Sequence, residues 1–379
     1  MEKQRWSDDV YSRVVEEFLE LVQIDSETKH EEKMASVLKE KFTSLGLAVV
    51  EDDAKERTGH GAGNLICTLP ETSSGFDPLY FIAHMDTVGP GKGIQPIVEN
   101  GYIQTDGTTI LGADDKAGIA AMLEATRVLQ ASKEPHGQIQ FVITVGEEAG
   151  LVGAKALAKD AISASYGYAL DSDGEVGGMI TSAPSQAKIF AKVYGKTAHA
   201  GVEPEKGISA IAVASKAVSK MPLGRIDADT TANIGRFEGG TQTNIVCDVV
   251  TITAEARSLV EEKLKQQVEA MKQAFEQAAL EMSTSCDVQV TYSYPGYREP
   301  EDTKVVQTAI RAIKACGLTP MTTSSGGGSD ANIISGYGIP TINLSVGYEG
   351  IHTTSERISI EALENTAKLV VEIARSARK

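Results

Sequence analysis

Cysteine is scarce in this chain of 379 residues. The four cysteines are scattered along the sequence and form no C-x-x-C pair: Cys67, Cys247, Cys286 and Cys316. Disulfide frameworks and thiolate zinc sites both need cysteines at characteristic spacings. The sequence therefore favours buried free thiols over either kind of cysteine site.

Long apolar runs are also missing. No apolar segment approaches the roughly 20 residues that a membrane-spanning helix needs. The first residues pass directly into an amphipathic helical pattern, without the basic region and the apolar region of a signal peptide. These absences predict a cytoplasmic protein that does not span or bind a membrane.

Basic residues are outnumbered by acidic ones, 36 to 52, which gives a formal net charge of -16. Binding to nucleic-acid phosphates needs clustered Lys and Arg, and this chain concentrates them nowhere. We therefore expect no nucleic-acid partner. Carboxylates that ligate divalent cations would account for part of the negative charge.

The length and the hydrophobic patterning predict two domains, because a single core usually stops growing below this size. Apolar strand-like runs alternate with helical patterns over residues 1–185 and again over 295–379, which favours an α/β fold with a mostly parallel central sheet. Residues 186–294 show strand, helix, two strands, helix and strand. This order predicts an inserted α+β domain of ferredoxin-like type.

Several of the strand-like runs end in residues that can bind a metal. The run Phe81–Ala83 leads into His84, and Asp86 follows on the same side of the extended segment. In open α/β sheets, ligand-binding groups gather at the carboxyl ends of the strands. A histidine there can ligate a metal through one ring nitrogen while a carboxylate fixes the other nitrogen. Taken alone, this motif is more typical of a structural, hydrogen-bonded histidine.

Two motifs carry adjacent acidic residues. Asp114 and Asp115 lie between a glycine-flanked turn and a helix start, where aspartate usually acts as a cap, although one such carboxylate can bridge two cations. Glu147 and Glu148 follow an apolar run, and adjacent carboxylates are difficult to desolvate together unless a cation neutralises them. One of the two glutamates can then ligate a metal while the other accepts a proton.

Asp171, at the end of the run GYALD, and His352, after the run INLSV, complete the candidate metal ligands. Asp173 is an alternative to Asp171, since the segment reads LDSDGEVGG. We favour Asp171 because it directly ends the apolar run.

The motifs HMDTV, TTILGADDKAGIAAM, GEEAGLVGA and HTTSER resemble the signatures of the M20 family of metallopeptidases, in order and in spacing. Within that family the sequence is similar to the peptidase T-like tripeptide aminopeptidases, over essentially the whole chain. The resemblance implies two Zn²⁺ ions per subunit, with Co²⁺ or Mn²⁺ as alternatives. It also implies a cis peptide bond after Asp114 and five metal ligands: His84 and Asp171 for one ion, Glu148 and His352 for the other, and Asp114 bridging both.

The same resemblance implies roles for further residues. Glu147 would be the general base that acts on a metal-bridging water, and Asp86 would orient His84. The inserted domain would be a lid that also forms a homodimer, in which His199 of the motif KTAHAG reaches the partner's active site and stabilises the oxyanion. Asn244 and Arg257 would bind the substrate carboxylate. Apart from the resemblance, the glycine content of the loop 325–330 indicates that its backbone N–H groups can approach a substrate terminus closely, which makes Gly327 and Ser329 candidate substrate-binding residues.

The sequence thus predicts a di-zinc aminopeptidase that acts on short peptides. One alternative is another M20 specificity with the same metal chemistry, namely a carboxypeptidase, a dipeptidase or an N-acyl amino acid deacylase. The other alternative is a metal-binding protein without catalytic activity, which would need neither Glu147 nor Asp86.

Overall fold

The computed structural model describes residues 8–379. These residues form two compact units, each with its own hydrophobic core. The first unit runs up to Ser182 and resumes at Arg298–Ser324 and Ser329–Lys379, and the second consists of Ala183–Tyr297 and Ser325–Gly328. No helix within the described residues is both long enough and apolar enough to cross a membrane.

The first unit is built on a mixed sheet whose four central strands are parallel. Across the sheet these strands are β6 (Ile139–Thr144), β3 (Leu79–His84), β7 (Tyr166–Ser172) and β16 (Thr341–Ser345). Further strands extend both edges: β1 (Ala48–Glu51) and β2 (Leu65–Leu69) beyond β6, and β8 (Gly178–Ala183), β14 (Tyr297–Arg298) and β15 (Met321–Ser324) beyond β16. The predicted α/β class with a mostly parallel central sheet is confirmed.

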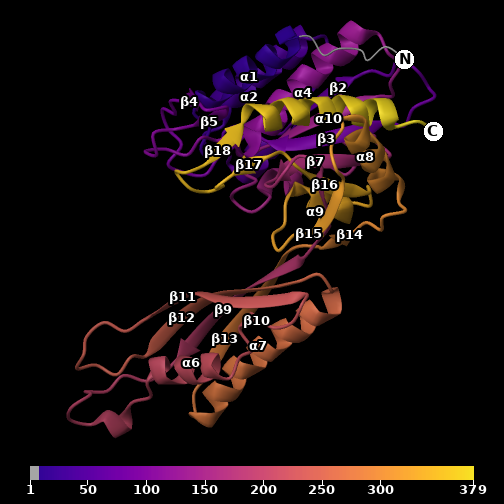
Figure 1. The fold of residues 1–379 in the computed structure, drawn as a ribbon. Helices are drawn as coiled ribbons and strands as arrows, with labels where there is room; N and C mark the ends of the chain where they lie inside the picture. The colour runs from indigo at the N-terminus through magenta and orange to yellow at the C-terminus, as the bar shows by residue number, and fades with distance from the viewer. Residues whose placement is uncertain (1–7) are drawn as a thin grey trace. The chain divides into compact units, whose positions relative to one another are not determined.

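Helices cover both faces of this sheet, which explains why strands β3, β6 and β16 are buried along their whole length. On one face α4 (Ala113–Ser132) lies against β3 and β7, and the helices around it are α1 (Asp8–Val22), α2 (Glu32–Ser44), α8 (Lys304–Ala315) and α10 (Ile360–Ser376). On the other face α9 (Asp330–Gly336) lies against β3, β7 and β16 (Figure 1). The short helices α3 (Ala54–Thr58) and α5 (Val152–Ala156) pack against each other, and α5 also packs against α9.

A second, small antiparallel sheet belongs to the same unit. Its strands, in spatial order, are β17 (Tyr348–Glu349), β18 (Arg357–Ser359), β5 (Tyr102–Gln104) and β4 (Ile97–Glu99). Strands β17 and β18 form a hairpin, and the connection between them carries His352. None of these four short strands is predicted from the sequence, because runs of two or three residues show no clear alternation.

The second unit is an antiparallel sheet with two helices on one face. The strands lie in the order β10 (Gly224–Arg225), β11 (Thr230–Gly239), β12 (Val249–Ser258), β9 (Ser185–Tyr194) and β13 (Cys286–Tyr294). Helices α6 (Ala210–Ser219) and α7 (Glu261–Glu281) follow β9 and β12 along the chain. Apart from the two-residue β10, this is the ferredoxin-like arrangement that the sequence predicts.

The start of α4 departs from regular helix at the predicted pair of aspartates. Asp114 has ψ 101° and Asp115 has ψ 35°, so the regular helix begins after them. The peptide bond between them is cis, as the family resemblance implies. The glycine-rich loop is shorter than expected from the sequence, because α9 already begins at Asp330.

Phe141 packs on the face of the main sheet that α2 covers. Its ring stacks on Phe42 of α2 and on Phe81 of β3, with ring centroids 5.9 and 6.0 Å apart. We expect Phe141→Ala to lower the free energy of unfolding of the first unit by about 3–5 kcal/mol, the usual cost of removing a buried phenyl ring. Urea unfolding followed by circular dichroism measures this. Val50→Ala, at an exposed position of β1, serves as the control, and an equal effect of the two variants would contradict the packing described.

Candidate metal centre

Three neighbouring parallel strands direct the predicted ligands to one edge of the main sheet. Strand β3 ends at His84, β7 ends one residue after Asp171, and the pair Glu147–Glu148 follows the end of β6. Because β6, β3 and β7 are adjacent and parallel, their carboxyl ends lie at the same edge. Asp114, at the start of α4, and His352, from the β17–β18 connection, reach the same place.

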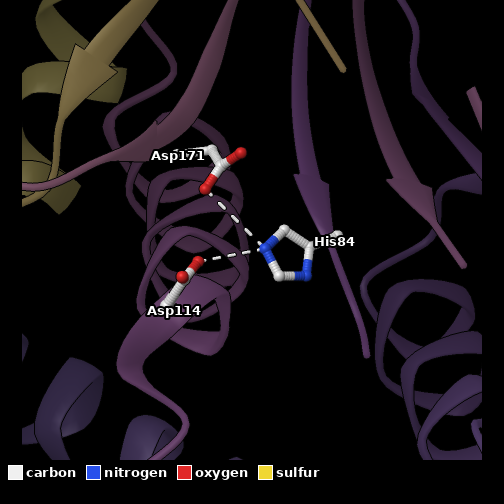
Figure 2. A group of neighbouring side chains, drawn as sticks. All are labelled: His84, Asp114 and Asp171. Atoms are coloured by element: carbon white, nitrogen blue, oxygen red, sulfur yellow. Dashed lines mark hydrogen bonds and ion pairs between the residues drawn. The ribbon is translucent and has the colours of Figure 1, made fainter. Parts of the chain in front are cut away.

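His84 is the centre of the first cluster (Figure 2). Its Nε2 lies 3.0 Å from Asp114 Oδ1 and 3.7 Å from Asp171 Oδ1. All three side chains are at least largely buried. Each offers one ligand atom to a common point, so this cluster could hold a metal ion.

His352 is the centre of the second cluster. Its Nε2 lies 3.0 Å from Glu148 Oε1 and 3.3 Å from Asp114 Oδ2. Asp114 therefore turns one carboxylate oxygen towards each histidine. The groups that could hold a metal among the described residues include His84, Asp114 and Asp171, and also Asp114, Glu148 and His352. A third group joins His84 to Glu147 and Glu148.

The pKa values in the two clusters reflect an excess of carboxylates over basic groups. Burial, and next the charge of Asp171, raise the pKa of Glu147 well above its usual value. Burial and the neighbouring Asp114 raise the pKa of Asp171 to about 7. Hydrogen bonds to Asp114 and Glu148 raise the pKa of His352 to about 10. Buried charges in proteins are paired or coordinate metals, and a set of two imidazoles with several carboxylates suits divalent cations such as zinc.

Asp115 takes the capping role that the sequence left open between the two aspartates. Its Oδ1 accepts a hydrogen bond from Gly118 N, 3.2 Å away, and its Oδ2 accepts one from His84 N, 3.3 Å away. Asp114 is thereby left to face the histidines. Asp173 is exposed, whereas Asp171 is in the first cluster.

Asp86 contacts both the histidine and the glutamate pair. The Nδ1 atom of His84 lies 2.9 Å from the main-chain oxygen of Asp86 and 3.6 Å from its carboxylate. The carboxylate accepts hydrogen bonds from Glu147 N at 2.9 Å and Glu148 N at 3.3 Å, and from the Thr28 hydroxyl at 2.7 Å. Asp86 thus connects the ends of β3 and β6.

Glu356 is one of several residues around the centre to which the sequence analysis assigns no role. Its buried carboxylate accepts hydrogen bonds from the backbone N–H groups of Leu111 and Gly112, and from that of Asp114 at 2.9 Å. It therefore fixes the turn that presents Asp114. Its position in the motif HTTSER was a signal that could have pointed to it.

Asn343 and Tyr348 contact the candidate ligands from the other side. The Asn343 side-chain amide bonds both the N–H and the C=O of Asp171, where the register of β16 and β7 shifts. The Tyr348 hydroxyl lies 3.2 Å from Asp171 Oδ1. Neither residue shows a sequence signal: Asn343 reads as an ordinary position of an apolar strand, and Tyr348 lies in a two-residue strand that the sequence does not predict.

The predicted residues of the second unit lie at opposite ends of its sheet: His199 and Asn244 lie beyond one end of β9 and β12, and Arg257 lies near the other end. His199 and Asn244 are exposed and lie on neighbouring backbone segments, since His199 pairs with Ile245 and Ala200 N donates to Asn244 O. The Arg257 guanidinium is bound by Glu255 and also donates to Gly326 O at 3.2 Å.

The remaining two predicted residues belong to the glycine-rich loop. Gly327 N donates to the Ser325 hydroxyl at 2.9 Å. The buried Ser329 caps α9, since its hydroxyl accepts from Ala331 N at 3.3 Å. Ser329 therefore has a structural role as the N-cap of α9.

Known proteins match most of this chain. The family model described as peptidase family M20/M25/M40 matches residues 80–376. The chain belongs to this family. Its enzymes are peptidases, and the resemblance drawn from the sequence motifs is confirmed.

Individual relatives extend the match to nearly the whole chain. The aminopeptidase PepT of Bacillus cereus shares 62% identity and a TM-score of 0.93, covering 97% of this chain and 98% of the other. A tripeptidase of Staphylococcus aureus shares 51% identity and a TM-score of 0.95, over 97% and 99%. The uncharacterized protein YqjE of Bacillus subtilis is 63% identical over 367 residues, which are 97% of this chain and 99% of the relative.

Binding of divalent cations should release protons from the metal-free protein. The pKa of His352 is about 10 and that of His84 is raised well above its usual value by its bonds to carboxylates, against burial, so both rings hold a proton at neutral pH. Ligation requires their neutral form, and we expect release of at least about two protons per chain. Calorimetric titration with Zn²⁺ at about pH 7.5, in buffers of different ionisation enthalpy, counts them.

The raised pKa of His352 also gives the sign of the pH dependence of stability. Because the folded pKa of His352 lies above its usual 6.5, its stabilising effect on the metal-free protein is complete below pH 6.5 and is lost as the pH rises to about 10. In the zinc-loaded protein the stability should not fall in this way as the pH rises. In the calorimetric titration, heats of binding that do not vary with the buffer would contradict the proposed protonation of the two histidines.

Proposed function

We propose that this chain is an aminopeptidase that hydrolyses short peptides, in particular tripeptides, with the help of two divalent cations. The observation that carries the proposal is the position of Asp114, whose two carboxylate oxygens face His84 and His352 separately. Bridging by one carboxylate is typical of two-metal hydrolases. The named functions of the similar Bacillus cereus and Staphylococcus aureus enzymes support the peptide class.

The ligands divide between two positions. His84 and Asp171 would hold one cation, Glu148 and His352 the other, and Asp114 would contact both. Zinc suits this set of imidazole and carboxylate donors best, and cobalt or manganese can replace it. When bound, the cations would polarise the peptide carbonyl and lower the pKa of a water molecule.

Glu147 is proposed as the general base. Its neighbour Glu148 faces His352, whereas Glu147 lies outside both groups that contain Asp114. Glu147 is half-buried, and burial together with the charge of Asp171 raises its pKa, so it can take up and hold a proton during attack on the peptide bond. The Asp86 carboxylate bonds the backbone N–H of Glu147 and thereby fixes where the base stands.

The second unit is proposed to act as a lid and to form a homodimer. His199 would stabilise the oxyanion in the partner's active site, which suits its exposed position. Asn244, Arg257, Gly327 and Ser329 would bind the substrate. The proximity of His199 to Asn244 supports a common task, and the planar, forked N–H donors of a guanidinium suit a peptide carboxylate.

A peptide panel tests the proposed substrate class. We expect the zinc-loaded enzyme to release the N-terminal residue from free tripeptides, because an aminopeptidase requires a free amine. N-acetylated tripeptides and N-acyl amino acids should be hydrolysed far more slowly. Product analysis by mass spectrometry distinguishes the specificities: release of the C-terminal residue would indicate a carboxypeptidase, and preference for N-acyl amino acids a deacylase.

Glu147→Gln should lower kcat by about 10²–10⁴-fold, the usual contribution of a general base. The variant should retain its metal, since the carboxylate that it replaces is not a proposed ligand. Steady-state kinetics and metal analysis by atomic emission measure both quantities. Glu148→Gln is the matched comparison, and it should lose metal as well as activity. Turnover near the wild-type rate in Glu147→Gln would refute the assignment.

Asp171→Asn and Asp173→Asn decide which aspartate is the ligand. Only Asp171 lies near His84, so Asp171→Asn should lower the metal content from about two ions per chain towards one. Asp173→Asn, at an exposed position, should keep both ions. Metal analysis after dialysis against a weak chelator measures the difference. The reverse pattern would transfer the role to Asp173.

A further inference from the structure

Tyr348 places a single hydroxyl between two of the proposed ligands. It is the first residue of β17, and its side chain is 1% exposed. The hydroxyl lies 3.2 Å from Asp171 Oδ1 and 3.5 Å from Asp114 Oδ1. A buried hydroxyl between two carboxylates can donate its one proton to whichever of them is ionised, since an ionised carboxylate is an acceptor only.

The contact is confined to one half of the centre. The two Oδ1 atoms that Tyr348 reaches are the same atoms that face His84 Nε2. The other half uses Asp114 Oδ2 and Glu148 Oε1. Within residues 8–379, the hydrogen bonds of the Tyr348 hydroxyl go to the two Oδ1 atoms and not to these. The hydrogen bonds of Tyr348 therefore distinguish two positions that otherwise share a ligand.

The hairpin that carries Tyr348 is held firmly at its other end. Tyr348 pairs with Ile358 across β17 and β18, and the connection between the strands ends in Glu356. The Glu356 carboxylate binds the backbone of the Asp114 turn. One hairpin thus fixes Asp114 twice, through its backbone and through its carboxylate.

We propose that Tyr348 is a positioning residue that holds the carboxylates of Asp171 and Asp114 in place for the cation on the His84 side only. This inference rests on the proposed two-metal function. Groups that hydrogen-bond to metal ligands typically change metal affinity by about 10–100-fold. Loss of the hydroxyl should therefore weaken one of two stepwise binding constants and leave the other unchanged.

The test compares Tyr348→Phe with the wild-type protein in titrations of the metal-free full chain with Co²⁺. Calorimetry gives the two stepwise binding constants, and the visible absorption of Co²⁺ reports the ligand geometry at each step. Asp171→Asn and Glu148→Gln identify which step belongs to which half. Tyr168→Phe is the matched control, because Tyr168 is also fully buried and donates its hydroxyl, to Val305 O at 2.8 Å, away from the ligands.

We expect Tyr348→Phe to weaken by about 10–100-fold the step that Asp171→Asn abolishes, and to change the Co²⁺ spectrum of that step alone. Tyr168→Phe should leave both steps as in the wild type. Equal weakening of both steps, no weakening, or the same effect from Tyr168→Phe would overturn the inference. If Asp171→Asn and Glu148→Gln themselves leave both steps intact, the proposed two-metal function fails instead.

Discussion

The carboxylate of Asp114 is the group on which the rest of the centre depends. It is buried, it faces two histidines that are 268 positions apart in the sequence (84 and 352), and it turns a different oxygen to each. Taking such a charge out of water is costly unless positive charge compensates it. In the metal-free protein that compensation comes from protonated histidines, and cations would provide it in the loaded protein.

The fold brings these groups together by simple means. Parallel strands deliver His84, Asp171 and the glutamate pair to one sheet edge, and helices on both faces bury the strands. The surrounding hydrogen bonds then fix the backbone on which the ligands stand. Asp86 binds the N–H groups of the glutamate pair, Glu356 binds the Asp114 turn, and Asn343 binds Asp171. The ligands are therefore held by polar contacts that do not themselves need a cation.

The sequence predicts the fold class of both units. It also identifies the candidate ligands that meet at the centre, because these residues end apolar runs or belong to specific motifs. The sequence does not identify three further residues around the centre, because they matter only through contacts between distant segments: Tyr348, Asn343 and Thr28. Glu356 stands in a recognisable motif, yet a glutamate in a loop reads as a solvated charge until the buried N–H groups around it are seen. The choice between Asp114 and Asp115 likewise needs structure, in which Asp115 caps α4 and binds His84 N.

The central claim is that two cations share Asp114, and anomalous diffraction from zinc-loaded crystals tests it most directly. We predict two anomalous peaks at the zinc edge, one between His84 and Asp171 and one between Glu148 and His352, with Asp114 contacting both. A single peak, or a second peak away from Asp114, would contradict the account.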